Sequence, residues 1–287
     1  DRLRQRVIDA GARGMFASVM LFQGWSVCHS TNMFSWHPYN AGMNSNGVDG
    51  DADDNGAGEV TCSTSMPPTE PTEAWWVHQR NYVKKVVDTL NDLDNFMYEV
   101  SNEAGCCTTD TQSMNWQTAV KNYLRSYEAG KPKQHLVVVG AAKKANVSGH
   151  AYNLLLYNSD ADVVAPSRIT ATNSGNPDEM KGGRCSGGSN SGAACSVPSQ
   201  CPGGSCAGPP ALGTTYALKP SFLDTDHISD LSAMPDTTGV DWAWKAALRG
   251  YQPLYMDGWG DWGSTPSQAL RDNLGYIRSY IERMTLA

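Results

Sequence analysis

The strongest constraint on the fold is an alternation along the chain between short apolar segments of strand length and longer segments with helical periodicity. Such an alternation predicts an α/β fold in which helices cover a parallel sheet. The first strand is continuously apolar and is expected to be buried, and the last helix is expected to turn Ile281 and Met284 inward. Strands are expected at residues 14–22, 96–103, 136–140, 162–166, 221–223 and 253–256, and helices at 2–10, 73–93, 115–129, 241–249 and 266–284.

The composition suits one globular domain. The chain has 287 residues, which is enough for one large α/β domain or two small ones, and 40% of them are hydrophobic and 18% charged. We expect a single domain over residues 1–287. A net charge of −7 gives no electrostatic support to a nucleic-acid partner. No apolar run approaches the length of a membrane span, so no membrane partner is expected.

The eight cysteines favour disulfides over a zinc site, because no close cysteine pair is matched by a second pair of cysteines or histidines. Disulfides indicate an oxidising compartment, so we expect a secreted protein, extracellular or periplasmic. Residues 171–215 are rich in Gly, Ser and Cys and cannot build an apolar core. We expect them to form a disulfide-rich surface insertion, with the pairing left open. The cysteines are Cys28, Cys62, Cys106, Cys107, Cys185, Cys195, Cys201 and Cys206.

Acidic side chains stand at the ends of two predicted strands. Asn102 and Glu103 end the apolar run from Phe96, and Asp224 and Asp226 follow a later one. Catalytic groups of barrel enzymes lie at this carboxyl rim. The alternative for Glu103 is that it only caps the next helix.

Several short motifs of the sequence together resemble a known family of enzymes. The run Tyr98–Glu103, followed three units later by an acid at another strand end, resembles the clan A retaining glycoside hydrolases. The segments Phe22–Ser26, His37–Asn40 and Asp224–His227 are similar to a poorly characterised bacterial branch of that clan. The resemblance implies a (β/α)8 TIM-barrel-like fold whose six recognised βα units are strands three to eight. The first two strands are missing from this pattern.

The resemblance also implies roles for individual residues in cleaving a plant or microbial polysaccharide or oligosaccharide. Glu103 would be the general acid/base, and Asn102 would bind the sugar 2-hydroxyl. Asp224 or Asp226 would be the nucleophile where the clan has Glu, which leaves retention and inversion both open, and Asp224 is favoured because it follows the apolar run directly. Further sugar contacts are expected from Trp25, His37, Tyr39, Asn40, His227 and Trp259.

Two further expectations concern other classes of function. The alternative hypothesis is a non-catalytic carbohydrate-binding protein on a degenerate barrel. It is favoured by the Asp where the clan has the nucleophilic Glu and by the two missing strands. No cofactor is required for glycoside cleavage. However, the segment Asp51–Gly56 fits the opening of a calcium loop, with Asp51, Asp53 and Asn55 as oxygen ligands. Cys62 stands where the bidentate Glu of such a loop belongs, so a solvated acidic loop is the alternative.

A barrel without its first two strands would have a free edge on each side. These edges would be Gly14–Phe22 and Pro253–Met256. An unpaired edge invites association, so we expect an open barrel whose edge is covered, with a homodimer favoured. The alternatives are a cover made by the loop after residue 22 or by the cysteine-rich insertion, and a chain that is a piece of a longer product.

Overall fold

A computed structural model describes the parts of the chain that form two compact units. One unit comprises Asp1–Val147 with Asn158–Val163, and the other Ser148–Tyr157 with Val164–Ala287. Each unit is described by itself below. The described residues are 2–28, 33–51, 53–62, 74–102, 104, 109–140, 156, 159–165, 183–191, 194–195, 199, 201–207, 219–225, 237–248, 250–255 and 268–284.

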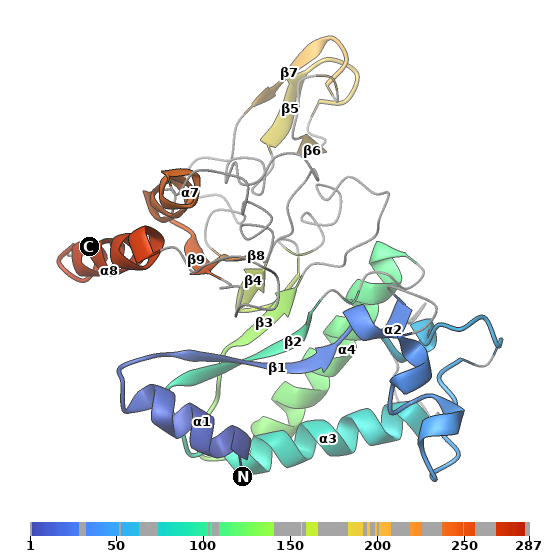
Figure 1. The fold of residues 1–287 in the computed structure, drawn as a ribbon. Coiled ribbons are helices and arrows are strands. Elements are labelled where there is room, and N and C mark those ends of the chain that lie inside the picture. The colour runs from blue at the N-terminus through green and yellow to red at the C-terminus, as the bar shows by residue number, and fades with distance from the viewer. Residues whose placement is uncertain are drawn as a thin grey trace. The chain divides into compact units, whose positions relative to one another are not determined.

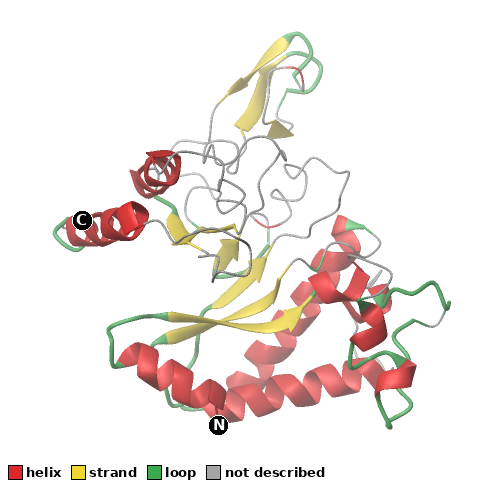
Figure 2. Ribbon diagram, viewed as in Figure 1, coloured by secondary structure: helices red, strands yellow, loops and turns green. Residues whose placement is uncertain are grey.

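The first unit is organised around a parallel sheet with the strand order β1-β2-β3-β4. Its strands are β1 (Ala17–Gln23), β2 (Phe96–Asn102), β3 (Val137–Gly140) and β4 (Val163–Ala165), and the boundary between the two units falls inside β4. The same unit contains three longer helices, α1 (Arg2–Gly11), α3 (Ala74–Leu90) and α4 (Asp110–Glu128). Figures 1 and 2 show α3 and α4 running along one side of β1 and β2.

The packing of this unit follows the predicted periodicity. The helix α3 buries Val83, Val86, Val87 and Leu90, each at most 4% exposed, at the spacing expected for one helical face. Strand β2 is buried along nearly its whole length, as a central strand of a covered sheet must be. These predictions are therefore confirmed.

Strand β1 corrects the expectation of a continuously buried segment. Its residues alternate in burial, and Met20 remains 37% exposed, while Met15 and Phe16 just before it are 49% and 57% exposed. Successive side chains of a strand point to opposite faces of the sheet, so one face of β1 is covered and the face that carries Met20 is partly open. β1 is also the first strand in the sheet order and pairs only with β2 among the described strands.

The chain after β1 runs through short helical turns before it reaches α3. These are α2 (Trp25–Cys28), η1 (Phe34–Trp36), η2 (Ala41–Met43) and η3 (Glu59–Cys62). The ring of Phe34 is fully buried and lies so close to Gly58 that a Cβ there would be 2.0 Å from it. The packing of Phe34 against Gly58 therefore joins two distant parts of the segment between β1 and α3.

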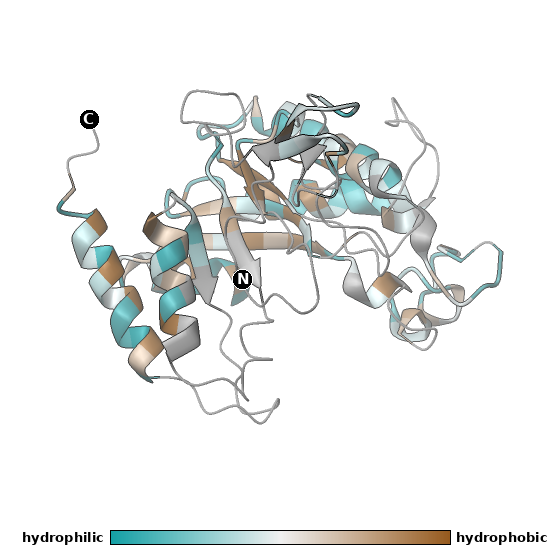
Figure 3. Cartoon of the chain, turned by 90° about the horizontal axis from the view of Figure 1, so that it is seen from above, coloured by the Kyte–Doolittle hydropathy of each residue, from teal (hydrophilic) through white to brown (hydrophobic). Residues whose placement is uncertain are grey.

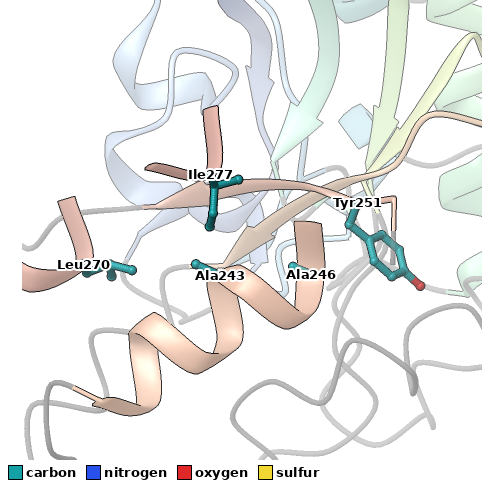
Figure 4. Close-up of a cluster of buried hydrophobic side chains, with 5 residues drawn as sticks. All are labelled: Ala243, Ala246, Tyr251, Leu270 and Ile277. Atoms are coloured by element: carbon teal, nitrogen blue, oxygen red, sulfur yellow. The ribbon is translucent and has the colours of Figure 1, made fainter. Parts of the chain in front are cut away.

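The second unit contains a pair of parallel strands, β8 (Phe222–Thr225) and β9 (Gln252–Tyr255). Val164 forms an isolated parallel bridge with Ser221, just before β8. Helices α7 (Thr237–Leu248) and α8 (Gln268–Ile281) pack on each other. Figure 4 shows the buried cluster that joins them, which consists of Ala243, Ala246, Tyr251, Leu270 and Ile277.

The end of α8 departs from the sequence prediction. Ile281 is 38% exposed and Met284 is 56% exposed, although both were expected to face inward. In Figure 3 the helix nearest the C-terminus alternates hydrophobic and hydrophilic residues along its length. The buried members of its stripe, Leu270 and Ile277, lie in the part of the helix that α7 covers, so the pattern continues beyond the surface available to bury it.

The cysteine-rich segment forms a small antiparallel sheet with the order β6-β5-β7. Its strands are β5 (Gly183–Gly187), β6 (Ala194–Cys195) and β7 (Gly204–Ala207). A disulfide joins Cys185 to Cys201, and these two cysteines are the buried cluster of this segment. The prediction that a disulfide replaces an apolar core here is confirmed.

The fold is therefore a mixed α/β fold, as the alternation predicted. All six expected strands are present as β1, β2, β3, β4, β8 and β9. Closure of these strands into a barrel is not seen within the described ranges. None of the helices described has the length and apolar character needed to cross a membrane.

Candidate functional site

The candidate site lies at the carboxyl ends of β1 and β2, where the register places Gln23 beside Asn102. The Nδ2 of Asn102 donates a hydrogen bond to Oε1 of Gln23 at 3.0 Å. The backbone N–H of Gly24 donates to the carbonyl oxygen of Asn102 at 2.8 Å. Two contacts, one from the last residue of β1 and one from the residue after it, thus orient the residue that directly precedes Glu103.

The residue after Glu103 is held equally closely. A Cβ added to Gly24 would lie 2.4 Å from Cα of Ala104, so only glycine permits this approach of the two backbones. The carbonyl oxygen of Ala104 accepts a hydrogen bond of 3.0 Å from the hydroxyl of Ser113 on α4. Glu103 itself lies outside the described residues, but the backbone on both sides of it is anchored.

The loop after β1 contributes His37 and Tyr39. The imidazole of His37 stacks on Phe34 with ring centroids 5.3 Å apart, and it contacts the ring of Tyr39 at the same centroid distance. Its Nδ1 accepts a hydrogen bond of 3.2 Å from the backbone N–H of Tyr39. The carbonyl oxygen of Tyr39 in turn accepts from the N–H of Gly50 at 2.8 Å, which ties the acidic loop to the same place.

These groups meet at a small pocket that is partly open to solvent. The pocket brings His37 and Tyr39 together with the ends of β1 and β2. It also includes side chains that sequence reasoning did not select, among them Gln23, Gln79 and Ser101. The described lining residues are Phe22, Gln23, Gly24, Val27, His37, Tyr39, Thr61, Cys62, Gln79, Ser101 and Trp116.

Gln79 is the polar residue that holds the floor of the pocket together. It is 1% exposed, its Oε1 accepts a hydrogen bond from Nε1 of Trp116 at 3.0 Å, and its Nε2 donates to the carbonyl oxygen of Thr61 at 2.5 Å. It therefore links α3, α4 and η3 within the core. A polar residue on the apolar face of the predicted helix 73–93 was the sequence signal that could have found it.

Burial sets the protonation of the two aromatic residues in the loop. Desolvation lowers the pKa of His37, so the imidazole is neutral at pH 7 and above. Desolvation also raises the pKa of Tyr39 to about 12, with a smaller contribution from the nearby Tyr82. The loop therefore presents two uncharged groups to the pocket near neutral pH.

The other predicted sugar contacts are placed less fully. The side chain of Asn40 accepts a hydrogen bond from the N–H of Gly42 at 3.0 Å, which caps η2, and Asn40 does not line the pocket. Trp25 lies in α2, but its side chain is not among the described atoms. His227 and Trp259 lie outside the described residues.

The second carboxylate remains a prediction. Asp224 is the third residue of β8 and pairs with Leu254 in β9, so it lies inside the strand rather than after it. Its side chain is not described, and Asp226 lies outside the described residues. The separation of either carboxylate from Glu103 therefore stays untested.

The acidic loop uses its own polar groups to fix its shape. The two carboxylate oxygens of Asp51 accept hydrogen bonds from the N–H groups of Asn55 at 2.9 Å and Gly56 at 2.8 Å. Asp53 and Asn55 are exposed and bond each other at 3.0 Å. Within the described ranges, no group of three or more His, Cys, Asp or Glu side chains could hold a metal ion. Calcium binding through Asp51, Asp53 and Asn55 stays a prediction.

Comparisons with models of protein families, with curated proteins and with solved structures find no match for this chain.

Proposed function

We propose that this chain is a glycoside hydrolase in which Glu103 is the general acid/base. The observation that carries the proposal is the placement of Asn102 at the carboxyl end of the buried strand β2, oriented by Gln23 and directly before Glu103. An amide fixed beside a carboxylic acid provides a hydrogen-bonding group for a sugar hydroxyl and a proton for the leaving oxygen. The anchoring of Ala104 by Ser113 further supports a rigid setting for Glu103.

The strand arrangement supports the finer proposal of a (β/α)8-type barrel. Pairs β1-β2, β2-β3 and β8-β9 are all parallel and follow the order of the sequence, and Val164 bridges to Ser221 in the same sense. Parallel strands connected through helices in sequence order are the building units of that barrel. Asp224 in β8, or Asp226 after it, would supply the second carboxylate.

A double-carboxylate mechanism assigns the steps in outline. Glu103 protonates the glycosidic oxygen as the bond to the leaving sugar breaks. In the retaining route the carboxylate of Asp224 or Asp226 attacks the anomeric carbon as that bond breaks, and a water activated by the deprotonated Glu103 then hydrolyses the glycosyl-enzyme and returns the proton to Glu103. In the inverting route the carboxylate activates a water that attacks the anomeric carbon directly. A separation of roughly 5–5.5 Å between the carboxyl groups gives retention, and one of roughly 6.5–9.5 Å gives inversion. The configuration of the first product, followed by NMR, distinguishes the two.

The proposal is tested with Glu103→Gln on a panel of plant and microbial polysaccharides. Gln keeps the size of the side chain but cannot transfer a proton, so turnover should fall by about 10²–10⁴-fold. Glu282→Gln is the matched control, because Glu282 is an exposed residue of an i,i+4 ion pair on α8 and should leave turnover unchanged. Full activity in a folded Glu103→Gln variant would contradict the assignment.

A non-catalytic carbohydrate-binding protein is the second candidate, and the observation that favours it is the Asp at the position of the expected Glu. It predicts saccharide binding without release of reducing ends. Binding that survives Glu103→Gln together with no hydrolysis by the wild type would select this candidate.

The edge strand β1 supports a homodimer. Its segment Ala17–Gln23 contains no charged residue and no proline, the devices by which edge strands commonly avoid pairing. Met20 within the strand and Met15 and Phe16 just before it are exposed. We therefore propose that a second copy covers this edge in the secreted protein. Sedimentation of a monomer at micromolar concentration would contradict this.

A further inference from the structure

We propose that the disulfide of Cys62 ends at Cys106 or Cys107, the adjacent pair that follows Glu103 by three and four residues. This bond makes Cys62 a positioning residue for the proposed acid/base. The inference rests on the proposed function for its consequence, but the pairing itself does not depend on that function. Its starting point is that Cys62 is disulfide-bonded and only 2% exposed.

The possible partners of Cys62 are few. Cys185 and Cys201 are bonded to each other, which excludes both, and the other two cysteines of the insertion belong to the second unit. Four of the eight cysteines lie in the first unit, so all four can pair within it, in three ways. Two of these ways join Cys62 to the pair Cys106–Cys107, and the third joins it to Cys28.

The alternative pairing with Cys28 conflicts with covalent geometry. The residue before Cys28 accepts a hydrogen bond from the N–H of Gly58 at 3.0 Å, so Cys28 is also close to η3. However, a Cys28–Cys62 bond leaves the adjacent pair to bond to itself or to remain as thiols. The Cα atoms of adjacent residues are about 3.8 Å apart, whereas a disulfide usually needs about 4.4–6.8 Å. A bond within the pair is therefore strained, and free thiols are uncommon where disulfides form.

The helix α4 brings the two ends of the proposed bond to the same place. The hydroxyl of Ser113 donates to the carbonyl oxygen of Ala104 at 3.0 Å, which fixes the chain just before the adjacent pair. Three residues further on, the indole N–H of Trp116 donates to Gln79, whose amide donates to the carbonyl oxygen of the residue before Cys62 at 2.5 Å. Residues three apart on a helix are neighbours on its surface. One stretch of α4 therefore holds both parts of the chain.

The segment that carries the adjacent pair is short and held at both ends. Ala104 is bonded to α4, and the side chain of Thr109 caps that helix, so four residues separate two described positions. One residue spans at most roughly 3.6 Å, so each cysteine of the pair lies within about 7 Å of the nearer end. Gly24, where a Cβ would be 2.4 Å from Cα of Ala104, lines the same small pocket as Cys62. Only the width of that pocket separates Cys62 from the chain that touches Ala104.

The proposed bond gives the segment after Glu103 a third point of attachment. Ala104 and Thr109 hold its two ends, and the disulfide holds its middle to η3, which Gln79 fixes in the core. A misplacement of a catalytic group by about 1 Å can lower the rate by about 10²-fold. Removing the bond should therefore lower turnover although it removes no group that touches the substrate.

Peptide mapping without reductant tests the pairing directly. Free thiols are first blocked by alkylation, which prevents disulfide exchange. A protease that cuts before aspartate then places Cys28, Cys62 and the adjacent pair in three different peptides, which are residues 9–48, 54–87 and 94–109.

We expect residues 54–87 to be linked to residues 94–109, with residues 9–48 joined to the same assembly through the second cysteine of the pair. A link between residues 9–48 and 54–87 that leaves residues 94–109 by themselves would overturn the inference. So would a link from Cys62 to the insertion.

The variant Cys62→Ser tests the positioning role. We expect kcat to fall by about 10–10²-fold with little change in KM, because the acid/base is displaced while the binding groups remain. Amide hydrogen exchange should increase in residues 104–109 but not in α3. The matched control replaces Cys185 and Cys201 with serine, which removes a disulfide of the other unit and should change neither measurement. Wild-type kcat or wild-type exchange in a folded Cys62→Ser variant would overturn the positioning role.

The outcomes also separate this inference from the proposed function. If the peptide map and the exchange agree with the pairing but no polysaccharide is cleaved, the disulfide stands and the hydrolase fails. If polysaccharides are cleaved by a protein in which Cys62 is joined to Cys28, the hydrolase stands and this inference is wrong. If Cys62→Ser does not fold, the map of the wild-type protein decides.

Discussion

Replacing His135 with leucine should strongly destabilise the first unit, and the effect should depend on pH. His135 lies between α4 and β3, and its Nδ1 is 2.7 Å from Oε1 of Glu128 while its Nε2 is 2.8 Å from the carbonyl oxygen of Leu93. A carboxylate oxygen and a carbonyl oxygen both accept hydrogen bonds, so this geometry is satisfied when both ring nitrogens carry hydrogen and the imidazole is positively charged. The side chains of His135 and Glu128 are only 5% and 1% exposed, which makes this a buried ion pair.

The direction of the pKa shift agrees with that geometry. Burial by itself lowers the pKa of His135, but the hydrogen bonds to Glu128 and Leu93, together with the charges of Glu128 and Asp94, outweigh it and raise the pKa. A group with a raised pKa in the folded state stabilises the fold fully below its unfolded value of about 6.5. That contribution is lost as the pH rises through the folded pKa.

The magnitude follows from what His135→Leu leaves behind. Removing one partner of a buried ion pair costs about 3–5 kcal/mol, because the other charge stays buried. Glu128 keeps the Nδ2 of Asn91 at 2.9 Å and the backbone N–H of residue 135 at 2.9 Å, so we expect the lower end, about 3 kcal/mol. A loss of this size is a large part of the roughly 5–15 kcal/mol that stabilises a typical domain.

Urea unfolding at pH 6 and at pH 8.5, with the disulfides intact, measures both quantities. The difference between wild type and His135→Leu should be greatest at pH 6 and should shrink toward pH 8.5. Arg278→Ala is the control, because its ion pair with Glu282 is exposed and its loss should leave the stability close to that of the wild type at either pH. A His135→Leu variant as stable as wild type at pH 6 would refute the reasoning, and an equal loss at both pH values would show that the pair does not titrate in this range.

Three further predictions concern the site and the insertion. Gln79→Met should lower the free energy of unfolding by about 2–4 kcal/mol, because it leaves the indole N–H of Trp116 and the carbonyl oxygen of Thr61 buried without their partner. Thermal unfolding measures this loss, and an unchanged melting temperature would argue against the network. Gly24→Ala should lower turnover more than stability, because its Cβ would displace the residues on both sides of Glu103, so wild-type kinetics would be inconsistent with the close approach. Reduction of the Cys185–Cys201 disulfide should expose residues 183–207 to limited proteolysis before the helices, and first cuts within α3 or α4 would contradict this.

The local elements could be predicted from the sequence because hydrophobic periodicity is a local property of the chain. The spacing of the valines in α3 and the apolar run of β2 are enough to predict which of these residues are buried. The start of α4 was placed too late because its first turn is polar. The signal there was a capping pattern, in which the hydroxyl of Thr109 accepts from the N–H of Gln112 at 3.2 Å.

The position of Asn102 and Glu103 at a strand end was likewise readable from the sequence, since it depends on where an apolar run stops. The contact between Asn102 and Gln23 was not, because the two residues are 79 positions apart and meet only through the register of β1 and β2. The same is true of Gln79 and Trp116, whose pairing depends on how two helices cross. Periodicity assigns a residue to a face, but it does not say which residue faces it.

Tertiary structure alone decided the features that set the environment of the site. Whether the apolar segment Ala17–Gln23 is central or at an edge depends on which strands pair with it, and all apolar strands look alike in sequence. The pairing of Cys185 with Cys201 depends on the folding of a segment without periodicity. The neutral state of His37 arises from burial beside Phe34 and from the N–H of Tyr39, and burial is a property of the folded chain that no local pattern contains.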